Sequence, residues 1–310
     1  MRTRILTSIV AAIAFAGNSH IVAQEADPII NGNKLSELVA AFKAAKTTQE
    51  RSQIAVAIGN GKEKAKSAVP LLAEALKDKD PLMRMNIAMA LRSMGGAAAP
   101  AVPNLIAGLK DSDTSGPTIR AEGVRAQIAF ALGAIGPEAK AAVPALSDIF
   151  KDAGQKTELR RAAAFALGSI GADAKDAMPL LTDALKDKDA RIRMAAANGL
   201  YLFDKANAKI ATPVFKALLK EKDEMLQTEV ALVLKSMGEG ANDAVPELMV
   251  VLAKGGMPAY YAREALGKIP AAEPALVAAL SDSDAKLKEA AAGVLKEYYP
   301  EAAKKAGLTK

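Results

Sequence analysis

Histidine and cysteine, which often carry catalysis or bind metals near neutral pH, are almost absent from this 310-residue chain. The sequence contains one histidine, His20, and no cysteine. Histidine is the usual general base and a leading metal ligand, and a cysteine thiolate is a common nucleophile and soft ligand. Without these side chains, serine triads, zinc hydrolysis, covalent haem and most iron sites are excluded from the region after His20. Disulfides are excluded as well.

Aspartate and arginine recur at a fixed spacing. Asp80 precedes Arg84, and Asp189 precedes Arg193 at the same interval. Carboxylate-only chemistry remains open, but catalytic acids rarely repeat along an array. We interpret these residues as a structural ladder. In it, the aspartate caps a helix and the arginine reaches a capping aspartate in its own or the next unit, each rung contributing at most about 1 kcal/mol. We therefore expect no catalytic residue, no metal and no cofactor, and predict that the protein is not an enzyme.

A glycine-rich string from Gly59 to Lys62 partly matches a phosphate-binding loop. The string follows a helical pattern, lacks the full spacing, and has Glu63 where serine or threonine is required. We interpret it as a helix end, where glycine permits a positive φ.

The elements that position these residues repeat along the chain. The segment from Ala68 to Gly95 returns from Ala177 with its proline, its Lys-Asp-Lys-Asp run and its Arg-Met pair at the same offsets. Apolar residues at helical spacing follow the proline, and Asp80 followed by Pro81 begins a second helix. The unit is a helical hairpin, and one hairpin cannot bury both apolar stripes without a neighbour.

The hairpin unit accounts for most of the chain. With a divergent N-terminal pair at 33–66, the proline markers give about eight antiparallel helix pairs. We predict an all-α fold, a right-handed α-solenoid (armadillo-like superhelix) that forms one domain at 33–300. Residues 24–32 are expected to be a linker and 301–310 a tail. The markers are Pro70, Pro103, Pro144, Pro179, Pro213, Pro246 and Pro274.

The first residues do not match the repeat. Arg2 and Arg4 precede an apolar run, Ile5 to Gly17, and a cleavage site precedes Gln24. The apolar run is too short to span a bilayer comfortably, and no later segment resembles a membrane span. We predict that residues 1–23 are a signal peptide, with an uncleaved anchor as the alternative, and that the protein is exported to the periplasm or secreted.

The charge balance is moderately basic. The formal net charge is +6, and removal of Arg2 and Arg4 leaves 39 basic against 35 acidic side chains. Because the excess is mostly lysine mixed with acids, and tryptophan is absent, we expect no nucleic-acid partner. A weak affinity for anionic polymers or envelope surfaces remains open.

The recurring Asp80 with Arg84, the corresponding Asp189 with Arg193, and the Ala-Leu-Gly string at 166–168 form one pattern. This pattern resembles the HEAT repeat, and more closely the short bacterial HEAT-like repeats named after phycobilisome lyases. The resemblance covers about 33–299 and implies the solenoid, but these repeats host many functions. HEAT-like deoxyhypusine hydroxylases bind a di-iron centre through His-Glu motifs, and the sequence contains no such motif.

The second helices of stacked hairpins usually line the concave side, so we expect the partner surface there, over units 125–263. All five tyrosines lie in the C-terminal part; they are either interface residues or rings that fill gaps and cover the last hairpin. An insertion, Asp111–Thr118, is either a binding loop or tolerated length. The candidate partner-binding residues are Tyr201, Tyr260, Tyr261, Arg125, Arg160 and Arg193.

From these patterns we predict a non-catalytic protein-binding scaffold of the cell envelope or exterior, monomeric on its own and with a protein partner. Two alternatives remain open. One is an accessory or enzyme related to phycobilin lyases that acts on a client protein, and the other is a structural component of an envelope assembly.

Overall fold

The structure is a computed structural model that describes residues 27–112 and 121–308. The predicted signal peptide at 1–23 lies outside the described residues. So does the Asp111–Thr118 insertion beyond its first two positions.

Helices dominate the described residues and form eight antiparallel pairs. The pairs follow one another in sequence, and a short terminal helix completes the chain. They are α1 (Leu35–Ala44) with α2 (Thr48–Asn60), α3 (Val69–Ala75) with α4 (Pro81–Met94), α5 (Val102–Gly108) with α6 (Ala121–Ile135), α7 (Val143–Lys151) with α8 (Thr157–Ile170), α9 (Met178–Asp183) with α10 (Ala190–Phe203), α11 (Ala208–Leu218) with α12 (Glu224–Met237), α13 (Val245–Lys254) with α14 (Gly256–Leu266), α15 (Ala272–Ala279) with α16 (Ala285–Tyr298), and finally α17 (Pro300–Lys305).

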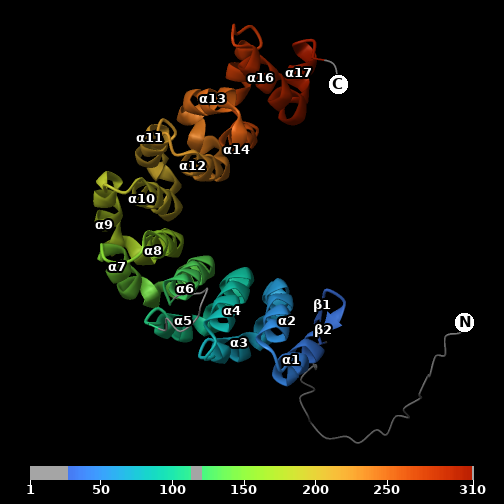
Figure 1. Cartoon of the computed structure of the whole chain (residues 1–310), viewed down its shortest axis with the longest axis vertical. Helices are drawn as coiled ribbons and strands as arrows, with labels where there is room; N and C mark the ends of the chain where they lie inside the picture. The colour runs from blue at the N-terminus through green and yellow to red at the C-terminus, as the bar shows by residue number, and fades with distance from the viewer. Residues whose placement is uncertain (1–26, 113–120, 309–310) are drawn as a thin grey trace, which may run out of the picture.

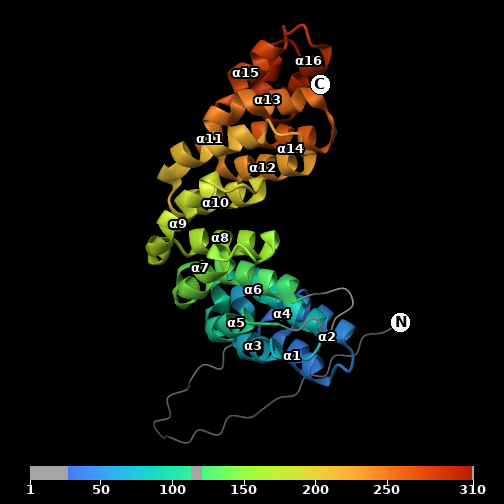
Figure 2. The ribbon, with the colours of Figure 1, turned by 60° about the vertical axis from the view of Figure 1, so that its left-hand side comes forward.

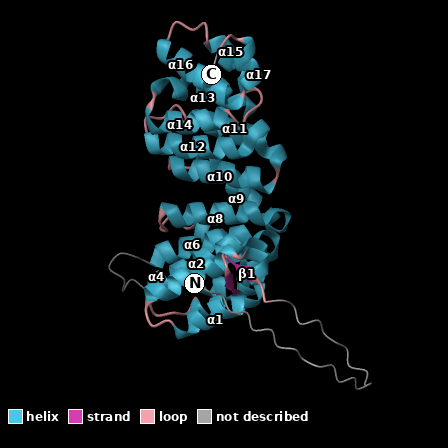
Figure 3. Cartoon of the chain, turned by 90° about the vertical axis from the view of Figure 1, so that its right-hand side faces the viewer, coloured by secondary structure: helices cyan, strands magenta, loops and turns pink. Residues whose placement is uncertain are grey.

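The pairs stack into an open arch (Figure 1). The even-numbered helices from α2 to α14 line its inner side, and the odd-numbered helices from α1 to α13 lie outside. The side views show the same sequential stack from the N-terminal to the C-terminal end (Figures 2 and 3). The prediction of an all-α solenoid is confirmed.

Short 3₁₀ segments connect each of the first six pairs to the next, whereas a turn without one joins α14 to α15. They are η1 (Lys62–Ala68), η2 (Gly95–Ala101), η3 (Gly136–Ala142), η4 (Gly171–Ala177), η6 (Lys205–Asn207) and η7 (Gly238–Ala244), while η5 (Ala184–Lys186) extends α9. Gly95 has a φ of 58°, which an L side chain rarely adopts, and it ends α4. The string after α2 differs from its prediction, because Gly61 has a φ of −70° and the positive φ falls on Lys62.

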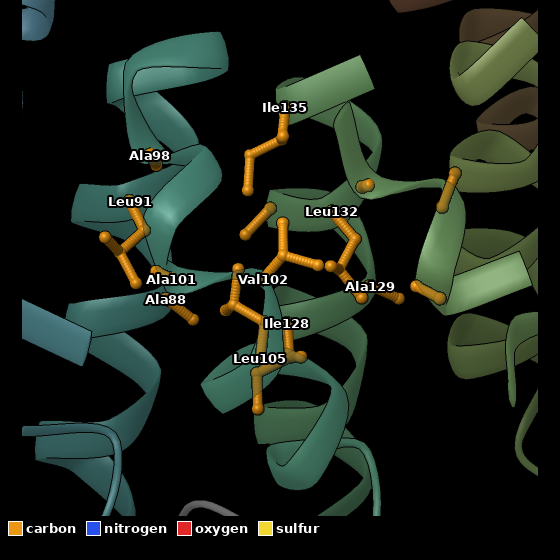
Figure 4. Packing of buried hydrophobic residues seen from close by; sticks show 14 of the residues in the cluster. Ala88, Leu91, Ala98, Ala101, Val102, Leu105, Ile128, Ala129, Leu132 and Ile135 are labelled. Carbon is orange, nitrogen blue, oxygen red and sulfur yellow. The ribbon is translucent and has the colours of Figure 1, made fainter. Parts of the chain in front are cut away.

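The core is a thin layer between the inner and outer helices, and it consists of two clusters of buried residues that meet at α10. Around α4, α5 and α6, Leu91, Leu105 and Ile128 are fully buried and point into the same layer (Figure 4). Alanines such as Ala88 and Ala129 lie between them and let the helices pack closely. Each hairpin therefore buries its stripe against its neighbours.

Both ends of the solenoid are covered, which corrects the predicted linker and tail. Strands β1 (Ile29–Ile30) and β2 (Asn33–Lys34) form an antiparallel pair at the N-terminal end, where Ile30 is buried beside Gly61. At the other end α17 buries Ala302 and Ala303. The end hairpins lack an outer neighbour, so their apolar surface requires such covers.

The inner helices are not evenly spaced. The backbones of α8 and α10 meet at Gly168 and Gly199, where an added Cβ on Gly168 would lie 2.6 Å from the Gly199 Cα. By contrast, α10 approaches α12 at far fewer positions than it approaches α8. The inner face is therefore tight between α8 and α10 and more open between α10 and α12.

Candidate functional site

Aspartates cap the second helices and connect them to the preceding unit. The Asp80 side chain accepts hydrogen bonds from the Leu82 N–H at 2.9 Å and from the Thr48 hydroxyl at 2.6 Å. The hydrogen bond from Thr48, supported by those from the backbone, lowers the pKa of Asp80 despite partial burial. This carboxylate is occupied by a structural role.

Asp189 caps its helix in the same way. Its side chain accepts hydrogen bonds from the Arg191 N–H at 2.9 Å and from the Thr157 hydroxyl at 2.8 Å. Burial acts to raise the pKa of Asp189, but the hydrogen bonds from Thr157 and the helix backbone outweigh it and lower the pKa. The threonine one turn before the ladder arginine thus ties each cap to the previous hairpin.

The ladder arginines have partners other than the predicted ones. Arg84 Nε donates to Asp111 Oδ2 at 2.6 Å, and its Nη1 donates to the Asp78 carbonyl at 2.8 Å. The sequence analysis paired Arg84 with a capping aspartate such as Asp80. The capping carboxylate turns toward the helix N–H groups and Thr48, so the arginine reaches the turn of the next unit instead.

The same connection recurs at the corresponding positions along one edge of the arch. In each case an arginine near the start of an inner helix reaches an acid in the following turn. The pairs are Arg51 with Asp78 at 2.5 Å, Arg160 with Asp187 at 3.2 Å, and Arg193 with Glu221 at 2.6 Å. The arginines also donate to carbonyls at or just after the ends of the outer helices, such as those of Phe150 and Asp187.

Three of these arginines had been assigned to the partner surface. Arg125 donates to the Leu109 carbonyl at 2.6 Å and to Gln155 at 3.1 Å. Arg160 and Arg193 are occupied by their ion pairs. All three side chains point into the edge of the stack, which makes them residues of the ladder and removes them from our candidate contact surface.

Tyr201 has the second of the two roles that the sequence left open for the tyrosines, because its ring fills a gap between hairpins. It is only 4% exposed, and its hydroxyl donates to the Met237 carbonyl at 3.2 Å. The ring occupies the slot that is Gly133 or Gly168 in other units, and it turns into the next hairpin beside Gly240. A side chain so buried cannot form part of a docking surface.

Tyr260 and Tyr261 are more accessible. Tyr260 is 55% exposed, Tyr261 is half-buried, and the two rings meet edge-on at 5.1 Å. Lys235 lies close to both rings, and its hydrogen bond to Glu264 at 2.7 Å raises the pKa of the ammonium group. These two tyrosines remain candidates for partner contact.

The last tyrosines cover the end of the solenoid. Tyr298 donates to Glu264 at 2.6 Å, which raises the pKa of its hydroxyl. Tyr299 donates to the carbonyls of Leu266 and Ile269, and burial raises the pKa of its hydroxyl. Both side chains stabilise the terminal hairpin.

A row of solvent-facing side chains runs along the inner helices and was missed by the sequence analysis. Each member lies five residues after the ladder position of its unit, outside the buried stripe. We call this set the inner-face row: Val56, Met89, Phe130, Phe165, Asn198 and Leu232. Aligning the units and asking which apolar residues lie off the buried stripe would have found it.

Most members of the inner-face row are apolar and accessible. Val56 is 46% exposed, Met89 44% and Leu232 42%. Phe130 and Phe165 are half-buried, with ring centroids 5.6 Å apart and planes tilted by 60°. The row presents an apolar line across α2 to α12 on the inner side of the arch.

A hollow of about 220 Å³ interrupts this row between α6, α8, α10 and α12. Phe130, Phe165 and Leu232 form apolar walls, and Asn198 lines it from α10. Arg161 on α8 pairs with Glu229 on α12 at 2.8 Å, across α10. Larger hollows of about 570 to 610 Å³ lie elsewhere and are lined mainly by charged and polar residues of the turns.

Within 27–112 and 121–308, no cluster of three or more histidine, cysteine or acidic side chains has a geometry that could hold a metal ion. No helix in that part of the chain is long and apolar enough to cross a bilayer.

The repeat is recognised by two families. HEAT repeats match residues 35–122 and 153–212, and the PBS lyase HEAT-like repeat matches residues 124–152. Residues 35–122 and 153–212 therefore contain HEAT repeats, and residues 124–152 contain a HEAT-like repeat of PBS lyase type. No curated protein matches the chain by sequence.

Solved structures share the solenoid. The complex of CpcE and CpcF of phycocyanin lyase from Nostoc sp. PCC7120 aligns with a TM-score of 0.57 and 22% identity, over 91% of this chain and 100% of that chain. Human deoxyhypusine hydroxylase in complex with glycerol aligns with a TM-score of 0.35 and 22% identity, over 85% and 95%. Importin beta aligns with a TM-score of 0.47 and 14% identity, over 84% and 40%. The first likeness shows a common fold, and the other two carry no argument.

The flat prediction that the protein is not an enzyme is wrong. A PBS lyase HEAT-like repeat is present, and the lyase complex shares the fold over most of this chain. The PBS lyase HEAT-like repeat leaves an enzyme-related role open. The missing histidine and cysteine exclude reactions that need those side chains, which is a narrower statement than excluding every enzymatic role.

Proposed function

We propose that the chain is a protein-binding scaffold whose contact surface is the inner face of the arch, centred on the inner-face row. The observation that carries this proposal is the alignment of Val56, Met89 and Leu232 with two phenylalanines on one face. Single exposed apolar residues are ordinary on protein surfaces. A row of them along a concave face, here interrupted by Asn198, is typical of an interaction site.

The arginine ladder also supports the inner-face row as the contact surface, because the ladder arginines are not available to a partner. The arginines at one edge of the inner helices are occupied by acids and carbonyls of the next unit. A partner would therefore gain little from them. The apolar row and the exposed Tyr260 offer area that can be buried on binding.

The experiment is an affinity capture with charge-inserting variants. Met89→Glu and Leu232→Glu place a carboxylate in the row, and Ile210→Glu is a matched control because Ile210 is 40% exposed on the outer helix α11. We expect each row variant to weaken capture of the partner about tenfold or more, since a desolvated charge opposes burial of the row. The control should bind as the wild type does. Undiminished capture by both row variants, with unchanged helical circular dichroism, would contradict the proposal.

A second candidate function is to act on a client protein, as an accessory or enzyme related to phycobilin lyases. The PBS lyase repeat and the shared fold favour it. The test is co-expression with a phycobiliprotein client and a source of tetrapyrrole. A coloured adduct on the client, lost when this chain is omitted, is the expected result; a colourless client in both cases would remove this candidate.

We also propose that the protein acts in the cell envelope or outside the cell, as a monomer. The pattern of Arg2, Arg4 and the apolar run up to Gly17 supports export. Cell fractionation with N-terminal sequencing tests it. A chain that begins at Gln24 in the exported fraction is expected, and an intact N-terminus confined to the cytoplasm would contradict export.

A further inference from the structure

We infer that the hollow between α6, α8, α10 and α12, the anchor pocket, receives one tyrosine or tryptophan side chain from an acidic segment of a protein partner. The inference rests on the proposed function and names the chemistry of the partner. It depends on three features of the pocket: its origin in the repeat, its size and polarity, and the charge beside it.

The anchor pocket exists because one member of the inner-face row is small and polar. Asn198 on α10 occupies the position held by Phe130 on α6 and Phe165 on α8. Phe165 and Leu232 therefore flank a position from which an aromatic ring is missing, and the hollow opens there. The wide separation of α10 and α12 leaves this space unfilled.

The volume of the pocket suits a single side chain. An apolar cavity of roughly 150 Å³ is enough to hold a benzene ring, whereas pockets for drug-sized ligands span roughly 300–1,000 Å³. The anchor pocket, at about 220 Å³, lies between these values. One aromatic side chain with a polar end fits this range.

The polar groups of the pocket favour tyrosine or tryptophan over phenylalanine. The Asn198 side-chain amide has no hydrogen-bond partner within the described residues. Glu229 Oε2 is buried and receives no well-aligned hydrogen bond, although Arg161 lies 2.8 Å away. A phenol O–H or an indole N–H would supply a donor, and the ring would pack between Phe165 and Leu232.

The charge beside the pocket favours an acidic segment. Arg92 on α4 is exposed, and its guanidinium lies over the Phe130 ring, 4.9 Å from the centroid. No carboxylate among the described residues pairs with Arg92. The chain as a whole is basic, with a pI of about 9.2. A partner carboxylate close to the aromatic anchor would complement Arg92, whereas a basic segment would be repelled.

The experiment is selection of a random peptide display library on the folded chain, followed by affinity measurements with the best synthetic peptide. We expect enriched peptides to contain a tyrosine or tryptophan with an aspartate or glutamate nearby. Asn198→Phe fills the pocket with the side chain that neighbouring units carry at that position, so the fold should be retained. It should weaken binding about 30-fold or more, as expected for loss of a hot-spot anchor.

Two further variants sharpen the result. Ile210→Phe also adds a phenylalanine, but on the outer helix α11 and outside the inner-face row, and should leave the peptide affinity unchanged. Arg92→Ala should weaken acidic peptides up to about fivefold, and a peptide with its acids neutralised should lose this difference. Thermal unfolding followed by circular dichroism checks that each variant is folded.

The outcomes separate the pocket from the scaffold. Enriched peptides without an aromatic residue, or full binding by Asn198→Phe while Met89→Glu loses binding, would overturn the pocket and leave the proposed function standing. Full binding by both variants would overturn both. Loss of binding in Asn198→Phe, with Ile210→Phe unaffected, supports the pocket.

Discussion

Gly168→Ala is the substitution for which the structure gives the sharpest stability prediction. Gly168 lies in α8, where it meets the backbone of Gly199 in α10. An added Cβ would lie 2.6 Å from the Gly199 Cα and closer still to its carbonyl oxygen. Because both neighbours are backbone atoms of a helix, no side-chain rotation can relieve the clash, and the two helices must move apart.

The expected magnitude combines two opposing effects. Overpacking a close-packed site costs about 1–3 kcal/mol, and this backbone contact is expected near the upper end. Alanine in place of glycine in a helix returns about 1 kcal/mol. The free energy of unfolding should therefore fall by about 2 kcal/mol.

Gly123→Ala is the matched control. Gly123 lies in α6, and no atom lies within 4 Å of an added Cβ. This variant should be neutral or more stable by up to about 1 kcal/mol. Urea unfolding followed by far-ultraviolet circular dichroism measures both variants. A Gly168→Ala protein as stable as the wild type, to within about 0.5 kcal/mol, would refute the helix contact and with it the uneven spacing that opens the anchor pocket.

Further predictions concern the ladder, the caps and the terminal cover. Arg84→Met removes a largely buried ion pair and should lower the free energy of unfolding by about 3 kcal/mol. Arg193→Met removes a more exposed ion pair and should lower it by under about 1 kcal/mol. Equal urea midpoints for the two variants would contradict the ladder assignment. The fold lowers the pKa of Asp80 from 3.8, so its stabilising effect is present above pH 3.8 and is lost as the pH falls through the folded pKa. As the pH is lowered below about 4, the urea midpoint of unfolding should therefore decrease, and it should decrease less steeply in Asp80→Asn. Tyr299→Phe removes a hydroxyl that donates to two carbonyls and should lower the free energy of unfolding by about 1 kcal/mol. Amide hydrogen exchange should become faster in α15 to α17 alone, and unchanged exchange in these helices would contradict the prediction.

The fold could be predicted because each repeat contains local sequence signals for the start and end of its helices. Pro70 in the first turn of α3, Asp80 before Pro81, and Gly95 after the last apolar residue mark the starts and ends of helices that the structure contains. Each signal is local, and the hairpin has few alternatives once both helices are known. The ends were harder, because Ile30 and α17 cover particular surfaces and do not follow the repeat.

The contacts of single side chains were harder to predict than the helices that carry them. Asp80 and Arg84 lie one helical turn apart, which favours pairing in sequence. The arginine instead reaches Asp111, since the hairpin offset places the next turn beside it. The same holds for Tyr201. Its position in the unit is known from the repeat, but the orientation of its ring depends on the next hairpin, where its hydroxyl donates to the Met237 carbonyl.

The inner-face row could have been found from the sequence, but the anchor pocket could not. Met89, Phe130 and Phe165 share one position of the unit, and this position lies off the buried stripe. Asn198 breaks that pattern. Whether Asn198 leaves a pocket depends on the distance between neighbouring inner helices such as α10 and α12, which varies with packing along the solenoid. Sequence alignment of the units gives the first observation and only the coordinates give the second.

Site-specific photo-crosslinking in intact cells tests the central claim most directly. A photoreactive amino acid at Met89 reports on the inner face, and one at Ile210, with nearly equal exposure, reports on the outer face. We predict a discrete protein adduct from the Met89 position and none from the Ile210 position. Adducts from Ile210 alone, or equal adducts from both positions, would contradict an inner-face scaffold.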